Sequence, residues 1–551
     1  MSALPAIAGE RRGRAIAAVA ALSLGQAGAA GAAAFATRDV FAALATPGSA
    51  GAGQDVAVAT IALSGAAIAA CRVGERLVAE RVGQDYAAAL RLEIFGHLSR
   101  LPARRLAERR AGGLALRCAG DLAAIRGWVS LGVARLLSAG IVLPAALAAV
   151  ALIEPALGLA AAVPMAAGLG AMALVGWRFR AAHGRLRRER ARLAGSMTER
   201  VLEAPALRLM GRAGLEAKAL ARRSARMIAA AGARARGGAL MRAVPDAVSG
   251  TAAAAILALA LGGAAGGAET AGALAALALS IQPLRDLAAV WDRRQTYLAA
   301  RDRCRALLAE PAPPAGQRSA PRLARGRPAR LAFRGVRAGP FRGLEASAGR
   351  GERIAVLGPN GSGKSTLLAL AAGLESPERG RVLVDGRPVQ TLDDRARARG
   401  LCHVGARSPI LAGSLRRALT MGAAGRRRLD DAAIADMARR FGLDPAIARL
   451  GGLSGRVASG GANLSAGEAR RLVLARAALS GAGLLLLDEP DDALDAEAPA
   501  LVATLLESTG ATVLIATHDP RIAALAGRCW RIGRDGRLCD DGGDDPRGEA
   551  A

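Results

Sequence analysis

One stretch of the sequence combines the residue types that hold phosphate groups. Residues 354–358 (Ile-Ala-Val-Leu-Gly) have the composition of a buried strand, and the helix-forming residues 367–372 follow shortly after. Glycines between them would let backbone N–H groups close on phosphate oxygens, and the helix start adds the positive end of its dipole. The pattern predicts a P-loop that binds ATP. Its candidate nucleotide-binding residues are Gly358, Pro359, Asn360, Gly361, Ser362, Gly363, Lys364, Ser365 and Thr366.

Two side chains of this loop have individual roles in such a site. We expect Lys364 to reach the β- and γ-phosphates and to act in catalysis, and Ser365 to ligate Mg²⁺. The other interpretation is a glycine-rich turn with an incidental lysine. The strand before the loop and the helix after it disfavour that interpretation.

An acidic pair follows another apolar run and could supply the groups for ATP hydrolysis that the P-loop lacks. Residues 484–487 are all leucine, and Asp488 and Glu489 follow them. At a strand end, Asp488 is placed to hold Mg²⁺ and Glu489 to polarise the attacking water. By itself this pattern also describes a strand that leads into a solvated turn. Downstream of a P-loop, the catalytic interpretation is favoured.

Between these two motifs, residues 464–468 (Leu-Ser-Ala-Gly-Glu) precede an amphipathic helix. A hydroxyl from Ser465 and backbone amides near Gly467, at a helix N-terminus, would suit an anion. Both residues are therefore candidates for contacting the nucleotide. A simple helix cap has the same composition, so the segment alone leaves both interpretations open.

The chain has 551 residues, of which 52% are hydrophobic. The strands and helices that must position these site residues lie in its second part. The first part contains six apolar stretches, each near the length that crosses a bilayer. We place these spans at residues 15–36, 56–71, 129–153, 155–176, 239–263 and 271–287. The first span continues too far to be a signal peptide, and we expect no removable targeting signal.

The strongly basic charge, +29, fits this topology. Sixteen Arg or Lys and four Glu lie between Trp177 and Gly238, in an insertion that we expect to continue the flanking helices into the cytoplasm. The charge therefore indicates cytoplasmic loops, and we expect no nucleic-acid partner. Trp128 and Trp177 fit an interfacial aromatic belt. The six cysteines have no paired or metal-type spacing, which predicts free thiols.

The fold class that follows is multi-domain. We predict an all-α six-helix transmembrane domain in residues 1–310 and a Pro- and Arg-rich linker in residues 311–328. Residues 329–551 alternate short β-type runs with helices, which predicts an α/β P-loop NTPase domain with a largely parallel sheet. We expect a multi-pass protein of a bacterial-type cytoplasmic (inner) membrane. Its spans would contact lipid, and its NTPase domain would lie in the cytoplasm.

The order of the motifs resembles that of the ATP-binding cassette (ABC) superfamily. Residues 464–468 are similar to its signature, Asp488 and Glu489 to its Walker B pair, and residues 493–495 to its D-loop. The resemblance implies a dimer in which the P-loop of one cassette and Ser465 and Gly467 of the other enclose each ATP. It also implies that His518, which follows the strand of residues 512–515, contacts the γ-phosphate and belongs to the catalytic set.

The membrane half also resembles exporters in which six spans are fused to the cassette. Residues 90–102, 113–117 and Asp121 look like their first intracellular loop, and residues 301–311 look like their exit from the sixth span. Within the signature, Gly-Glu and the following Arg-Arg are similar to the CydC and CydD thiol-exporter subunits. The resemblance implies a half-transporter with ATP and Mg²⁺ as cofactors and an unknown small molecule, lipid or peptide as cargo.

Several positions depart from the family pattern. Ala406 stands where the Q-loop glutamine is expected, Ser459 precedes the signature in place of glutamate, and Ala466 and Glu468 alter the signature itself. Phe341 is a doubtful substitute for the aromatic residue that stacks on adenine. These departures favour slow or loosely coupled hydrolysis and a heterodimer with a more regular half-transporter over a homodimer.

Two alternatives remain at this stage. A soluble-type cassette ATPase that acts on nucleic acid or ribosomes has the same motifs and a basic charge. A membrane-bound cassette protein with a regulatory role would tolerate the loss of the Q-loop glutamine.

Asp246, in the fifth span, either pairs with Arg242 or Arg285 or lines the export path.

Overall fold

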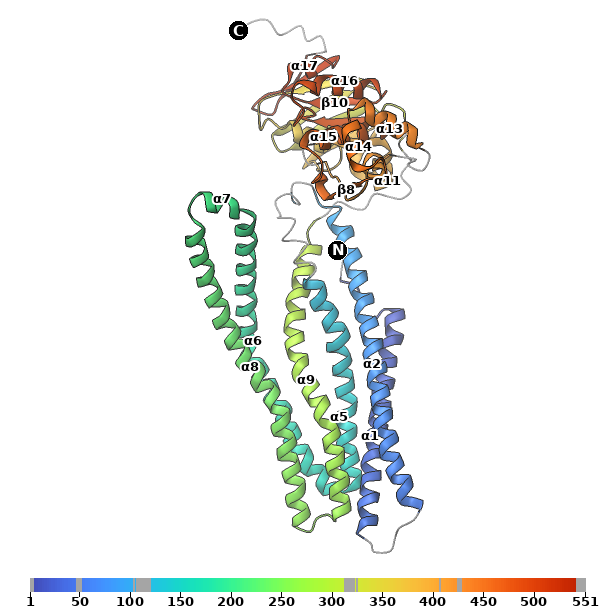
Figure 1. The fold of residues 1–551 in the computed structure, drawn as a ribbon, viewed down its shortest axis with the longest axis vertical. Helices are drawn as coiled ribbons and strands as arrows, with labels where there is room; N and C mark the ends of the chain where they lie inside the picture. Colours follow the sequence, from blue (N-terminus) through green and yellow to red (C-terminus); the bar gives the residue numbers. More distant parts are fainter. Residues whose placement is uncertain are drawn as a thin grey trace. The chain divides into compact units, whose positions relative to one another are not determined.

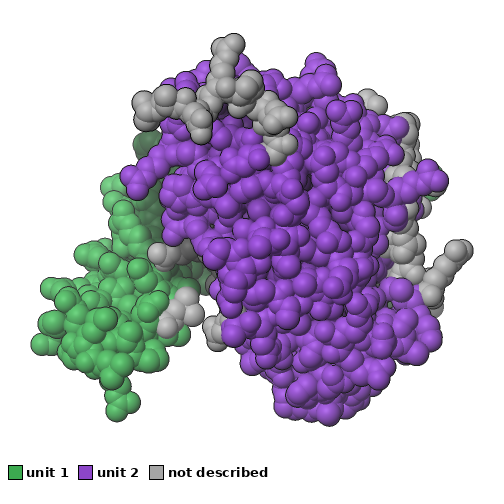
Figure 2. Space-filling view, turned by 90° about the horizontal axis from the view of Figure 1, so that it is seen from above, with its two compact units in different colours: residues 1–99, 109–310 green, residues 100–108, 311–551 purple. Residues whose placement is uncertain are grey.

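The computed structural model describes residues 4–45, 52–102, 105, 120–311, 323, 326–405, 408–423 and 429–541. Contacts divide the chain into two compact units, residues 1–99 with 109–310 and residues 100–108 with 311–551 (Figure 2). Among the described residues, the long helices belong to the first unit and the strands to the second.

Long helices form the first unit because its Ala- and Leu-rich stretches favour helix (Figure 1). They are α1 (Glu10–Leu44), α2 (Ala52–Leu98), α5 (Ala134–Ile153), α6 (Pro155–Leu202), α8 (Ala213–Leu261) and α9 (Gly267–Leu308). With α5 extended back to Gly120, the described residues contain six helices long and apolar enough to cross a membrane. Five predicted spans lie within one of these helices each, and the fifth, residues 239–263, extends two residues beyond the end of α8. The order is as predicted, which confirms the six-helix transmembrane architecture.

The helices on either side of the basic insertion extend well beyond the thickness of a bilayer. Helices α6 and α8 contain 48 and 49 residues, whereas about 20 residues cross the hydrocarbon core. The two helices lie side by side, and the short helix α7 (Ala204–Leu209) connects their ends (Figure 1). The structure confirms that the arginine-rich insertion continues the helices.

The aromatic-belt interpretation of Trp128 is wrong. Trp128 is buried and stacks on Tyr297, with ring centroids 5.3 Å apart. It begins a π-helical segment, η1 (Trp128–Val133), in which Gly132 faces the indole so closely that a Cβ there would lie 2.4 Å from the ring. Glycine therefore makes room for the ring inside the bundle. Trp177, by contrast, is 67% exposed, as a belt residue would be.

A six-stranded sheet forms the centre of the second unit, with strand order β12-β11-β3-β10-β9-β6. All neighbouring pairs are parallel except β11 with β12, which confirms the largely parallel sheet. Its strands are β3 (Arg353–Leu357), β6 (Leu401–Val404), β9 (Leu484–Asp488), β10 (Thr512–Ala516), β11 (Arg528–Ile532) and β12 (Leu538–Asp540). Buried aliphatic side chains on both faces explain the continuous apolar runs in the sequence.

A second sheet, with strand order β2-β1-β4-β5, is antiparallel. Its strands are β1 (Leu331–Ala338), β2 (Phe341–Ala348), β4 (Arg379–Val384) and β5 (Arg387–Pro388), and a third, two-stranded pair joins β7 (Gly413–Ser414) to β8 (Arg456–Val457). The helices of this unit are α10 (Lys364–Ala371), α11 (Asp394–Gly400), α12 (Leu415–Thr420), α13 (Asp431–Arg440), α14 (Asp444–Leu450), α15 (Ala466–Leu479), α16 (Ala498–Glu507) and α17 (Pro520–Ala523).

Strand register determines which loops meet. Strand β10 lies between β3 and β9, and Ala516 at its end pairs with Val356 on one side and with Asp488 on the other. Because the strands are parallel, their carboxyl ends share one edge of the sheet. The loops that follow β3, β9 and β10 are therefore brought together there.

Candidate functional site

The loop after β3 has backbone conformations and close contacts that require glycine. Gly361 and Gly363 have φ values of +81° and +108°, which side-chain-bearing residues rarely adopt. A Cβ on Gly363 would also lie 2.6 Å from Pro340, and one on Gly358 would lie 2.5 Å from a backbone oxygen. Pro359, Asn360 and Gly361 form the exposed tip of the loop, and Thr366 lies in the first turn of α10.

Lys364, the first residue of α10, folds over this loop. Its ammonium nitrogen donates hydrogen bonds to the carbonyl oxygens of Gly358 (2.9 Å) and Pro359 (3.3 Å), and it lies 2.9 Å from His518 Nε2. Burial lowers the pKa of Lys364, and the nearby carboxylates of Glu489 and Asp488 oppose that shift. The side chain is thus a positive charge held at the centre of the loop.

The acidic pair lies at the end of β9, opposite this lysine. Ser365 Oγ donates a hydrogen bond of 3.1 Å to Asp488 Oδ1. Glu489 has a φ of +47°, its backbone N–H donates to the Ala516 carbonyl, and its Oε1 lies 3.9 Å from His518 Nε2. The structure therefore brings together five predicted site residues from three loops: Lys364, Ser365, Asp488, Glu489 and His518.

The residues at this edge fit a bound nucleotide. Ser362 Oγ is buried and, among the described residues, has no hydrogen-bond partner, so it can bind an additional polar group. The start of α10 presents backbone N–H groups of the kind that bind phosphate. Ser365 and Asp488 offer two adjacent oxygen atoms, the type of ligand that Mg²⁺ takes in company with phosphate oxygens.

The signature residues lie at the start of α15. Ser465 Oγ accepts a hydrogen bond from the Glu468 backbone, and the Glu468 carboxylate accepts one from the Ser465 backbone, which is a complete capping box. This backbone hydrogen bond is the main reason why the pKa of Glu468 is lowered, and Arg449 lowers it further. Within the described ranges, no hydrogen bond or ion pair connects Ser465 or Gly467 to the site around Lys364 of the same chain.

Arg470 contacts the backbone of the candidate site and was missed by the motif analysis. The residue is 6% exposed, and its guanidinium donates to the carbonyl oxygens of Gly405 (3.0 Å), Pro490 (3.1 Å) and Asp488 (3.2 Å) and also to that of Glu489. It therefore ties the end of β6, the turn after β9 and helix α15 together. Its burial is visible only in the structure, because the sequence shows an arginine two residues after the signature and no sign of its contacts.

The structure shows the surroundings of Phe341 and of the segment that follows β6, where the sequence departs from the family pattern. Phe341 is fully buried in the core, with its ring against Gly363, so it cannot stack on adenine. Side chains of strand β2 point either toward the core or toward solvent, and Phe341 points toward the core, where its ring packs against the P-loop at Gly363. Ala406 and Arg407 lie outside the described residues. Ser408, which follows them, accepts a hydrogen bond from the Gly405 N–H (3.0 Å).

Two family comparisons cover most of the chain. Residues 17–284 match the family model described as ABC transporter transmembrane region, and residues 341–492 match the one described as ABC transporter. The transmembrane match, with six helices able to span a membrane, makes this a multi-pass membrane protein and disfavours the soluble-type alternative.

Curated relatives show where the similarity lies. The mycobactin import ATP-binding/permease protein IrtB of Mycobacterium tuberculosis is 41% identical over 198 residues, which are 35% of this chain and 33% of the relative. The glutathione/L-cysteine transport protein CydC of Escherichia coli is 36% identical over 33% of this chain and 31% of the relative. The chain thus matches only about a third of the length of these permease relatives.

Two further comparisons cover a larger share of the matched protein. The thiamine import ATP-binding protein ThiQ of Cereibacter sphaeroides is 41% identical over 198 residues, and the match covers 82% of that protein. The structure of a bacterial Atm1-family ABC exporter with ATP bound superposes with a TM-score of 0.80 over 95% of this chain and 94% of that one, at 21% identity. The fold, the converging site residues and these matches show that the chain belongs to the ABC transporter family.

Proposed function

We propose that this chain is one half of an ATP-driven membrane exporter, in which ATP binding and hydrolysis by the cassette move a substrate out of the cytoplasm. One observation carries the proposal: Lys364, Ser365, Asp488, Glu489 and His518 meet at one sheet edge, in a chain whose other unit has six helices able to span a membrane. Residues 1–310 are the transmembrane domain, residues 311–328 the linker and residues 329–551 the cassette, and the boundary between compact units after Glu310 supports this division.

Each site residue has a role in the proposed reaction. The P-loop residues 358–366 bind the phosphates, with the Lys364 ammonium as the central positive charge. Glu489 polarises the attacking water as a general base, and His518, next to both Lys364 and Glu489, contacts the γ-phosphate. Ser365 and Asp488 would hold Mg²⁺, which when bound would neutralise charge on the phosphates.

The second half of each ATP site comes from a partner half-transporter. Ser465 and Gly467 are at the exposed start of a helix and have no bond to their own chain's Lys364 site among the described residues, which suits a contact with a neighbouring cassette. The altered residues Ala466 and Glu468 favour a heterodimer with a more regular half. The transmembrane helices contact lipid, and no nucleic acid is involved.

Export is the favoured direction because the six spans and the cassette are fused in one chain. A multidrug efflux ATP-binding/permease protein of Mycobacterium tuberculosis is 33% identical over 47% of this chain, and its name supports export. Other relatives are named for import, and a transport assay measures the direction for this chain.

The test uses the tagged chain, purified from its native membranes so that a natural partner is retained, and reconstituted with the cassettes outside the vesicle. A cell extract supplies cargo, and mass spectrometry identifies compounds that enter the lumen when ATP is added. We expect Lys364→Ala to lose the nucleotide bound at this chain's own P-loop. Glu489→Gln should bind ATP there but hydrolyse it at this chain's site about 10²- to 10⁴-fold more slowly, because it removes a general base.

Both variants should abolish accumulation in the lumen. Glu507→Gln, which removes an exposed carboxylate at the end of α16, serves as the matched control and should change nothing. Hydrolysis without ATP-dependent accumulation of any compound would overturn export and favour the regulatory alternative.

A further inference from the structure

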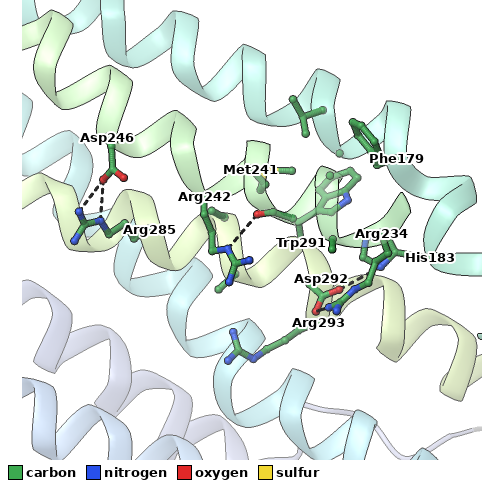
Figure 3. Close-up of a pocket in the computed structure, with 17 residues that line it drawn as sticks. Phe179, His183, Arg234, Met241, Arg242, Asp246, Arg285, Trp291, Asp292 and Arg293 are labelled. Atoms are coloured by element: carbon green, nitrogen blue, oxygen red, sulfur yellow. Dashed lines mark hydrogen bonds and ion pairs between the residues drawn. The ribbon is translucent and has the colours of Figure 1, made fainter. Parts of the chain in front are cut away.

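A cavity of about 630 Å³ lies among α6, α8 and α9 of the first unit (Figure 3). This volume is within the roughly 300–1,000 Å³ typical of small-molecule sites. Its lining residues fall between 175 and 183, between 234 and 246 and between 285 and 293, which are the cytoplasmic ends of three predicted spans. The cavity is therefore at the level where a substrate would arrive from the cytoplasm or from the inner leaflet.

Apolar side chains form one part of the wall. Phe179, Met241 and Trp291 line the cavity from three different helices. The Trp291 ring lies directly on Gly176, where a Cβ would come within 2.4 Å, and the Phe179 ring lies on Gly237, where a Cβ would come within 2.6 Å. The aromatic rings are thus held in place by close helix packing.

Charged side chains form the other part, and both aspartates of the lining are already paired. Asp246 binds Arg285 at 2.7 Å. Asp292 binds Arg234, and its Oδ1 lies 3.2 Å from His183 Nδ1. Figure 3 shows these two groups at opposite ends of the cavity. The pairing interpretation of Asp246 is therefore confirmed, with Arg285 as the partner, although Asp246 also lines the cavity.

Two lining arginines form no ion pair among the described residues. Arg242 donates only to the carbonyl oxygen of Gly238 in its own helix, at 3.2 Å, and Arg293 interacts with Asp286 and Asp292 at longer range only. With four arginines and two aspartates, the lining has a surplus of positive charge. Such a surplus beside apolar walls repels cations and favours an anion, because guanidinium groups bind carboxylate, sulfonate or phosphate oxygens with charge-assisted hydrogen bonds.

We propose that this cavity binds an amphipathic anion, with its acidic group at Arg242 and Arg293 and its apolar body against Phe179, Met241 and Trp291. The inference rests on the proposed function, because it names the class of cargo that the exporter takes. The acidic group can belong to a soluble compound or to the headgroup of a lipid, and the test separates the two sources.

The test compares two probes that differ in one charged group. The probe 8-anilinonaphthalene-1-sulfonate is an aromatic anion, and N-phenyl-1-naphthylamine is the same ring system without the sulfonate. Binding to the full chain in phosphatidylcholine nanodiscs, without nucleotide, is followed by energy transfer from tryptophan, with empty nanodiscs as blank. We expect the sulfonate probe to bind at least about tenfold more tightly than the neutral probe.

Matched double variants then locate the site. Arg242→Gln with Arg293→Gln should weaken binding of the sulfonate probe by at least about tenfold and leave the neutral probe unchanged, which also reports an intact cavity. Arg222→Gln with Arg236→Gln removes the same charge from exposed positions of α8 outside the lining and should have no effect. Equal affinity for the two probes, or equal losses in both double variants, would overturn the proposal.

Nanodiscs that also contain phosphatidylglycerol identify the source of the acidic group. Displacement of the sulfonate probe by this lipid indicates a lipid headgroup, and unchanged binding indicates a soluble amphipathic anion. ATP hydrolysis is measured on the same samples. If the protein hydrolyses ATP but does not prefer the sulfonate probe, only the proposal that the cavity binds an amphipathic anion is refuted. If it prefers the sulfonate probe but does not hydrolyse ATP, only the proposed function is refuted.

Discussion

At the scale of the residue, Arg470 determines how the catalytic turn after β9 is held. Its guanidinium donates to the backbone carbonyls of Asp488, Glu489 and Pro490, and to that of Gly405 on the other side. Glu489 has a positive φ, a conformation that costs free energy unless the surroundings enforce it. We therefore propose that Arg470 is a positioning residue, which would act on the reaction through the backbone of Glu489.

We predict that Arg470→Met lowers kcat for ATP hydrolysis more than it changes KM for ATP. The variant leaves buried carbonyl groups without a donor, which costs about 1–3 kcal/mol, and frees the Glu489 backbone. Arg470→Lys should restore part of kcat, and Arg439→Met on the exposed face of α13 should leave it unchanged. Steady-state kinetics and the thermal midpoint of each variant check this. A lower midpoint with normal kcat would mean that Arg470 is only structural.

Glu468 is a departure from the family pattern that the structure explains. Its carboxylate completes the capping box with Ser465 and also binds Arg449 at 2.7 Å. A glutamine at this position could complete the same box but could not form the ion pair. The substitution therefore strengthens the start of α15 and does not by itself remove the signature.

At the scale of the element, the packing of α6 against α8 and α9 depends on glycines that face aromatic rings. Gly237 of α8 faces Phe179 of α6, and Gly176 of α6 faces Trp291 of α9. Small residues of this kind let helix backbones approach closely where no hydrophobic effect drives association. Because the same rings line the cavity, helix packing and the shape of the cavity are determined together.

We expect Gly237→Ala to destabilise the transmembrane unit, because a Cβ there would overlap the Phe179 ring, and overpacking costs about 1–3 kcal/mol. Gly232→Ala on the same helix meets no atom within 4 Å. It should be neutral or slightly stabilising, since alanine favours helix by about 1 kcal/mol over glycine. Thermal unfolding of the full chain in detergent compares the two variants. Equal midpoints would show that the contact between Phe179 and Gly237 is not tight.

At the scale of the whole molecule, we expect a second chain to complete the ATP sites. The Lys364 group lies at the sheet edge, while Ser465 and Gly467 start another helix with no bond to it among the described residues. A complete ABC site therefore needs a second cassette, as the family resemblance implies. We propose a different half-transporter as the second chain, because Ala466 and Glu468 alter the signature of this one.

We predict that the tagged chain, purified from its native membranes, contains a second, different half-transporter in equal amount. Two copies of this chain with different tags, produced in the same cells, should not copurify. Native mass spectrometry and affinity pull-down measure both outcomes. A homodimer that hydrolyses ATP and transports with ordinary coupling would reject the heterodimer.

Much of this protein could be predicted from local sequence patterns. The P-loop was recognisable because its glycines, lysine and flanking strand and helix are adjacent in the chain, and they meet the same backbone requirements wherever they occur. The six spans followed from apolar length alone, because a bilayer requires it. Asp488 and Glu489 were found in the same way, from a leucine run that ends in two acids.

Tertiary structure decided what depends on residues distant in the sequence. His518 contacts Lys364 because strand β10 lies between β3 and β9, and no local pattern specifies that order. Phe341 is buried and Arg470 binds the catalytic turn because of the packing around them. The charge surplus of the cavity arises only where α6, α8 and α9 meet, since Arg242 and Arg293 form no ion pair among the described residues.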